Sequence, residues 1–293
     1  MFSRKKEKCP LCESLNISHK YQIDSYELKF DTDACSDCGF IFMNPPLTGD
    51  TIRSFYTEQY YSGRADYSYI DERRIMKYAA YVWDKRVEVI HRYVKEGRFL
   101  DVGASFGGLM ESAERFFTAY GIEISGYSAS HAAEKFGGRI HHGTLEDHPY
   151  SANFFSAITM IELIEHLENP LKAIEECYSL LADNGLLVIQ TANMDGQQAK
   201  SMAGRYEYFM PGHLSYFSMS NLSQALRKTG FSKVKIFYPV EFGLLPKLQK
   251  SRGSFTKISD YANWYRIAKY HMLGKIHWND FALKSSMVIY AFK

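Results

Sequence analysis

Four cysteines near the amino terminus have the spacing of metal ligands. Two Cys-x-x-Cys pairs, Cys9 with Cys12 and Cys35 with Cys38, are separated by 22 residues. Each pair can place two thiolates on one ion, and four thiolates complete a closed, structural zinc site. A redox-active dithiol is the alternative, although it would normally need only one such pair. The fifth cysteine, Cys177, falls in a helical pattern and is expected to be a small buried apolar residue.

A second group of residues combines acids with histidines. Glu162, Glu165 and His166 are spaced at i, i+3 and i+4, so one helical turn would project all three from a single face. His166, oriented by a carboxylate, would then be a general base that deprotonates a substrate hydroxyl. Together with the later His213, the same side chains could instead bind a divalent ion such as Mg²⁺. In a third interpretation they are structural hydrogen-bonding residues.

A glycine-rich segment is typical of a turn between a strand and a helix. The spacing Asp-x-Gly-x-x-x-Gly, formed by Asp101, Gly103 and Gly107, differs from the Gly-x-Gly-x-x-Gly of dinucleotide-binding proteins. Gly103 permits a tight turn, and the helix that follows would point free N–H groups at a ligand. Glu123 ends the next predicted strand, where an acidic residue usually binds ribose hydroxyls. The pattern indicates a nucleotide-type cofactor.

The elements that position these side chains follow from hydrophobic periodicity. Apolar residues recur at three- and four-residue intervals over Tyr69–Val94, which predicts a helix that ends at Gly97. Beyond Arg98, short apolar runs alternate with amphipathic segments, and this favours βαβ units in a mainly parallel, Rossmann-like sheet. The seven expected strands are Phe99–Val102, Thr118–Ile122, Arg139–His142, Ala157–Met160, Leu186–Gln190, Val234–Tyr238 and Met287–Phe292.

The chain divides by composition into three expected regions. Residues 1–48 form a zinc-ribbon module, residues 49–97 a helical connector or cap, and residues 98–293 an α/β domain with an insertion at about 241–280. The net charge is only +2, but residues 240–293 carry nine Lys or Arg and three Asp or Glu. The aromatic, basic insertion could cap a substrate pocket, or form a dimer surface or a membrane-apposed face. No export signal or membrane-spanning run is recognised, so a cytoplasmic protein is expected.

The segment from Arg98 to Phe292 resembles the class I S-adenosylmethionine-dependent methyltransferases, whose fold is a seven-stranded Rossmann-like sheet. The resemblance implies that the glycine turn wraps the methionine part of the cofactor, that the acid after the second strand holds the ribose, and that residues after the third strand contact adenine. Carried over to this sequence, the implied cofactor-binding residues are Asp101, Gly103, Ala104, Gly107, Glu123, Leu145 and Met160.

Two further resemblances bear on the reaction. The Glu-x-x-Glu-His pattern at Glu162, with the distant His213, is similar to metal-dependent methyltransferases that act on ubiquinone precursors and RNA 3′ ends. The cysteine module followed by Phe40–Pro46 is similar to bacterial methyltransferases encoded among glycan and secondary-metabolite genes, so the implied acceptor is a small molecule or glycan, methylated at a hydroxyl oxygen. The alternatives are an RNA methyltransferase that docks through its zinc ribbon and a non-catalytic module that kept the cofactor fold.

Overall fold

The computed structural model describes residues 1–61, 72–278 and 281–293. Its centre is a seven-stranded sheet with the order β10-β13-β8-β7-β4-β5-β6, in which only β13 runs antiparallel to its neighbours. All seven predicted strands and the Rossmann-like fold are confirmed, although β8 begins well before Leu186. The strands are β4 (Arg98–Val102), β5 (Thr118–Glu123), β6 (Ile140–His142), β7 (Phe155–Ile161), β8 (Leu181–Ala192), β10 (Lys233–Phe237) and β13 (Ser286–Phe292).

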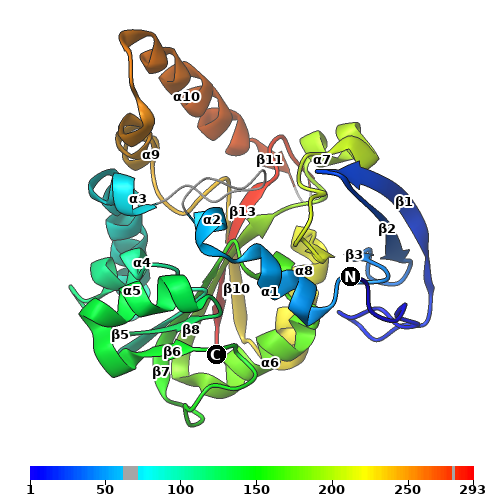
Figure 1. The fold of residues 1–293 in the computed structure, drawn as a ribbon, viewed down its shortest axis with the longest axis horizontal. Coiled ribbons are helices and arrows are strands. Elements are labelled where there is room, and N and C mark those ends of the chain that lie inside the picture. Colours follow the sequence, from blue (N-terminus) through cyan, green and yellow to red (C-terminus); the bar gives the residue numbers. More distant parts are fainter. Residues whose placement is uncertain (62–71, 279–280) are drawn as a thin grey trace.

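Helices cover both faces of this sheet (Figure 1). One face is covered by α3 (Glu72–Tyr93), α4 (Gly108–Ala113) and α5 (Gly126–Phe136), and the other by α6 (Pro170–Leu180) and α8 (Met219–Thr229). The helix predicted over Tyr69–Val94 corresponds to α3, and its predicted residues 69–71 lie outside the described part of the chain. Gly97 follows α3 with a φ of +112°, which suits the glycine predicted there.

The amino-terminal segment forms a second, smaller sheet with the order β1-β2-β3-β9. Its first three strands are β1 (Ile17–Ser25), β2 (Leu28–Cys35) and β3 (Ile41–Met43). The fourth strand, β9 (Ser215–Tyr216), comes much later in the sequence, between β8 and β10 of the large sheet. The short helices α1 (Gly49–Phe55) and α2 (Glu58–Tyr61) then lead back towards the large sheet. The amino-terminal segment is therefore joined to the rest of the protein by strand pairing.

The predicted insertion is helical and projects from the body of the protein (Figure 1). It contains α9 (Leu244–Ser251) and α10 (Ala262–Gly274) and ends in the short strands β11 (His277–Trp278) and β12 (Phe281–Ala282). Large apolar side chains on it are open to solvent, for example Ile258 at 89% and Tyr265 at 72% exposure. The remaining helix, α7 (Gln197–Met202), lies after β8. Among the described residues, no helix is both long enough and apolar enough to cross a bilayer.

The order of the strands fixes where a ligand binds. From β4 the chain winds outwards through β5 to β6, and it then returns to place β7 on the opposite side of β4. In such sheets ligands bind outside the carboxyl ends of the two strands at which the order reverses. The turn after β4 and the segment after β7 meet at this edge.

Candidate functional site

The turn after β4 has the backbone geometry that its glycines permit. Gly103 and Gly107 have φ values of +81° and +80°, and Ser105 between them is also left-handed at +49°. Gly107 is the amino-terminal cap of α4, and a Cβ atom at this position would lie 2.7 Å from the ring of Phe136. The α4 amino terminus therefore packs against α5 as closely as glycine allows.

Glu123 points back at this turn from the end of β5. Its Oε2 accepts a hydrogen bond from the backbone N–H of Ser105 at 2.8 Å, and its Oε1 accepts one from the N–H of Ser125 at 2.8 Å. Oε1 also accepts a bond from the hydroxyl of Tyr61 at 3.2 Å. Burial raises the pKa of Glu123, although these hydrogen bonds act in the opposite direction. Tyr61 was not predicted as a partner, because its segment and Glu123 are 62 residues apart.

The other predicted cofactor residues lie around the same edge. Asp101 is buried in β4 and accepts a hydrogen bond at 2.7 Å from the hydroxyl of Thr159. Ala104 is buried in the glycine turn, while Leu145 and Met160 are buried in the main core.

Three of the four predicted catalytic residues come together after β7. Glu165 and His166 lie in the 3₁₀ turn Ile164–His166, and one donor atom from each lies within 4.8 Å of one from His213. The prediction that Glu162 shares one helical face with Glu165 and His166 is wrong. Glu162 leaves β7 with a φ of +51° and is exposed, so the turn begins only after it.

Both histidines are held in one tautomer by backbone carbonyl groups. Nδ1 of His166 lies 2.9 Å from the carbonyl oxygen of Gly212, and Nδ1 of His213 lies 2.9 Å from that of Tyr208. A carbonyl can only accept, so each Nδ1 carries the proton and each Nε2 keeps its lone pair. The two rings are nearly perpendicular, with centroids 4.7 Å apart. The hydroxyl of Tyr56 also lies 3.0 Å from Nδ1 of His166, a contact that the sequence did not suggest.

Burial sets the charge state of this cluster. Glu165 is 1% exposed; its Oε1 accepts a 2.6 Å hydrogen bond from Tyr208, whereas no described residue bonds to its Oε2. Burial and the nearby charge of Glu162 raise the pKa of Glu165 well above its usual value. Burial lowers the pKa of His166 to about 4, and burial together with the neighbouring His166 lowers that of His213 well below its usual value. At neutral pH both imidazoles are therefore uncharged.

The four amino-terminal cysteines form a compact cluster of sulfur atoms. Sγ of Cys9 lies 3.7 Å from that of Cys38, and Sγ of Cys12 lies 3.6 Å from that of Cys35. Ligands at the usual Zn–S distance of about 2.3 Å on a tetrahedron would be separated by about 3.8 Å, so the cluster fits zinc. A hydrogen bond with Cys38 lowers the pKa of the Cys9 thiol to about 5, whereas burial raises the pKa of Cys12 and the hydrogen bond with Cys9 raises that of Cys38.

The cysteine module also supports the segment that carries His213. In the small sheet, Ile41 pairs with Tyr216 and Phe42 with Ser215, and the N–H of Met43 bonds to the carbonyl of Leu214. Leu214 in turn donates its N–H to the carbonyl of Glu165 at 2.8 Å. The amino-terminal module is therefore connected to both halves of the polar cluster by backbone hydrogen bonds.

Comparisons with known proteins agree with this geometry. A family model described as a methyltransferase domain matches residues 73–236. The chain is 25% identical over 188 residues to an uncharacterised protein of Methanocaldococcus jannaschii, and the match covers 61% of this chain and 88% of that protein.

Solved structures show the same fold. An S-adenosylmethionine-dependent methyltransferase from Thermotoga maritima superposes with a TM-score of 0.51 at 19% identity, over 76% of this chain and 95% of that one. Another from Archaeoglobus fulgidus has the same score and identity, over 73% and 94%. Because the family model spans more than half of the chain, the protein belongs to the methyltransferase domain family and is an S-adenosylmethionine-dependent methyltransferase.

Proposed function

We propose that the protein transfers the methyl group of S-adenosylmethionine to a hydroxyl oxygen of a small-molecule or glycan acceptor. The observation that carries this proposal is the pair of histidines beside Glu165, each with its Nδ1 proton directed at a backbone carbonyl. An uncharged imidazole fixed in this tautomer can accept the proton of a hydroxyl group at Nε2. The cluster follows β7, at the edge where the sheet order reverses.

The residues divide into those that hold the donor and those that prepare the acceptor. S-adenosylmethionine supplies a methyl group on a sulfonium sulfur. Glu123 would bind the ribose hydroxyls, and the turn around Gly103 would surround the methionine part. As the acceptor oxygen forms its bond to the methyl carbon and the carbon–sulfur bond breaks, His166 would take the hydroxyl proton. His213 and Glu165 would orient the acceptor, and Glu162 would contribute only its charge nearby.

A metal-dependent version of the reaction has one observation in its favour. The buried Oε2 of Glu165 has no partner among the described residues, and it lies in a group of potential ligands completed by His166 and His213. Two imidazoles and one carboxylate suit Mn²⁺, Fe²⁺ or Zn²⁺ better than Mg²⁺, which prefers oxygen ligands. An ion held there would lower the pKa of a bound hydroxyl. Full activity after exhaustive chelation would exclude this version, and recovery with Mn²⁺ but not Mg²⁺ would support it.

The four clustered cysteines would hold one structural zinc ion. RNA docking through this module is less well supported, because three of its basic side chains near the amino terminus pair with carboxylates. Arg4 pairs with Glu7, Lys5 with Asp33 and Lys6 with Glu168, at 3.0, 3.6 and 3.2 Å. Binding to a nucleic-acid backbone needs a broad footprint of available positive charge.

The variant His166→Ala tests the proposal. We expect the release of S-adenosylhomocysteine in the presence of a fractionated polar-metabolite and glycan extract to fall at least 100-fold, since one positioned base contributes about 10²–10⁴-fold. Calorimetric affinity for S-adenosylmethionine should stay within about twofold of the original protein. His19→Ala, on the exposed face of β1, is the matched control and should behave like the original protein. Undiminished turnover in His166→Ala would refute the assignment.

A further inference from the structure

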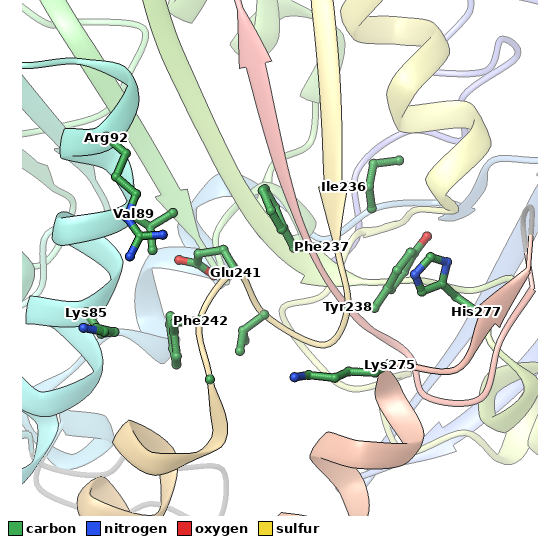
Figure 2. Close-up of a pocket in the computed structure, with 12 residues that line it drawn as sticks. Lys85, Val89, Arg92, Ile236, Phe237, Tyr238, Glu241, Phe242, Lys275 and His277 are labelled. Atoms are coloured by element: carbon green, nitrogen blue, oxygen red, sulfur yellow. The ribbon is translucent and has the colours of Figure 1, made fainter.

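A cavity of about 530 Å³ lies beside the large sheet (Figure 2). It is enclosed by α3, by the carboxyl end of β10, by the link from β10 to α9, and by the residues that follow α10. This volume is in the range of small-molecule sites. Because β10 runs parallel to β8, its carboxyl end lies at the same edge of the sheet as the reaction centre.

The floor of the cavity is apolar and aromatic. Val89 from α3 and Val240 and Phe242 from the link are all buried. On one wall, the ring of Tyr238 lies against that of His277, with centroids 5.0 Å apart. The floor can therefore accommodate the organic part of a ligand.

The rim of the cavity is positively charged. Arg92 and Lys275 enter it from α3 and from the end of α10, and both are exposed. No carboxylate in the described part of the chain lies within ion-pair distance of either, whereas Lys85 on the same rim pairs with Glu88 at 2.6 Å. The rim therefore carries two cations without an acidic partner, Arg92 and Lys275, and one that is paired with Glu88. This charge favours a ligand with more than one negative charge.

Among the described residues, the one acidic side chain that lines the cavity, Glu241, is already paired with a cation. Glu241 accepts a 2.7 Å hydrogen bond from Nε of Arg86, and the two side chains are 0% and 4% exposed. A buried pair of this kind leaves the charge of the rim unopposed. A phosphate group, with up to two charges, therefore matches the site better than a carboxylate with one.

A chain of polar side chains links this cavity to Glu162, which lies just before the turn that carries Glu165 and His166. Beyond Glu241, Arg86 donates to Oε1 of Gln190, and Gln190 donates to Oε1 of Glu162 at 2.5 Å. The strands β10 and β7 are separated by β13 and β8, so the distance spanned is three strand spacings, about 14 Å. An extended acceptor could occupy both places at once.

We propose that this cavity binds a phosphate-ester group of the acceptor, held by Arg92 and Lys275 while the acceptor hydroxyl lies at His166. The position of the acceptor hydroxyl at His166 rests on the proposed function, whereas the binding of a phosphate group in the cavity does not. Binding in the cavity itself involves no methyl transfer and can be measured separately.

The test is calorimetric titration of the zinc-loaded protein with inorganic pyrophosphate in the presence of S-adenosylhomocysteine. We expect saturable binding with one site per chain. The double variant Arg92→Gln/Lys275→Gln should weaken it at least 10-fold and leave the affinity for S-adenosylhomocysteine unchanged. The double variant Arg227→Gln/Lys233→Gln removes the same charges from exposed positions that do not line the cavity, and it should bind pyrophosphate like the original protein.

Two results would overturn the assignment of the cavity. One is the absence of saturable pyrophosphate binding, and the other is an equal loss of affinity in the rim and control variants, which would indicate attraction by net charge alone. Neither result would affect the His166 experiment. Conversely, pyrophosphate binding could depend on Arg92 and Lys275 while His166→Ala keeps full turnover. That result would support the binding site and refute the proposed role of His166.

Discussion

The carboxylate of Glu123 is surrounded by hydrogen-bond donors after β5. Two backbone N–H groups and the Tyr61 hydroxyl already bond to it, so its charge is compensated before any ribose arrives. Glu123→Gln replaces one acceptor oxygen by an NH₂ group that opposes a backbone N–H. Hydrogen bonds to charged groups contribute about 1.5–3 kcal/mol, so the affinity for S-adenosylmethionine should fall roughly 10- to 150-fold.

Calorimetry on purified protein measures this change directly. Glu111→Gln, on the exposed face of α4 where the side chain is 52% exposed, is the matched control and should retain its affinity. Equal affinity in both variants would remove Glu123 from the cofactor site.

His271 gives the protein a pH-dependent stability that can be isolated. It is 2% exposed, and no described residue bonds to either ring nitrogen. Burial, followed by the charges of Lys247 and Lys275, lowers its pKa from 6.5 to about 4. The unfolded chain therefore binds more protons between pH 6.5 and 4, and stability falls as the pH drops through this window.

His271→Leu should flatten this dependence. At pH 5, linkage through the shifted pKa of His271 corresponds to at most about 2 kcal/mol, and this loss should be absent from the variant. Urea denaturation at pH 7.5 and pH 5 measures the difference, and His19→Leu serves as the exposed control. The same pH-dependent loss in His271→Leu as in the original protein would contradict the prediction.

Single residues were predicted well where the signal is local. The positive φ value of Gly103 and the place of Glu123 follow from spacing along one strand–turn–helix unit. The proximity of His213 to His166 was also anticipated, since both follow neighbouring strands. Tyr56 and Tyr208, which contact His166 and Glu165, were not predicted as partners because such contacts depend on tertiary packing.

At the scale of elements, the join between β4 and α4 depends on Gly107. Its φ is +80°, and a Cβ atom there would meet the ring of Phe136 at 2.7 Å. Gly107→Ala should therefore lower the free energy of unfolding by about 1–2 kcal/mol and also weaken cofactor binding, because the start of α4 must shift. Gly138→Ala is the matched control, since nothing lies within 4 Å of its added methyl group.

Urea denaturation and calorimetry distinguish the two alanine variants. The prediction for Gly107 fails if both variants lose the same stability, or if Gly107→Ala binds S-adenosylmethionine with the original affinity.

Element prediction failed where the chain departs from periodic structure. The strands of the large sheet were found because buried parallel strands are continuous apolar runs. The hairpin of β1 and β2 carries many exposed polar residues and gave no comparable signal. The expected helix at Glu162 was wrong because that residue adopts a left-handed backbone conformation, which begins a tight turn instead.

At the scale of the whole molecule, the cysteine module and the large sheet share one core. Cys9, Cys35 and Phe40 belong to the same buried cluster as Leu187 and Ile289 of the central strands. The ring of Phe40 packs on that of Phe217 with centroids 5.0 Å apart, directly beyond β9. Composition could separate residues 1–48 from the rest, but it could not reveal that Ile41 of β3 pairs with Tyr216, 175 residues later.

This shared core predicts that zinc stabilises the entire protein in one cooperative transition. All three tryptophans, Trp83, Trp264 and Trp278, lie outside the cysteine module, so their fluorescence reports only on the remainder. Cys38→Ser should abolish bound zinc and lower the fluorescence-detected unfolding midpoint together with the far-ultraviolet circular dichroism midpoint, because a structural zinc contributes its binding energy to folding. Ser36→Ala, an exposed change beside the second cysteine pair, should keep both the zinc and the midpoint. If the module instead unfolded by itself, the tryptophan midpoint would not move in Cys38→Ser, and His213 would have to be held by the large sheet alone.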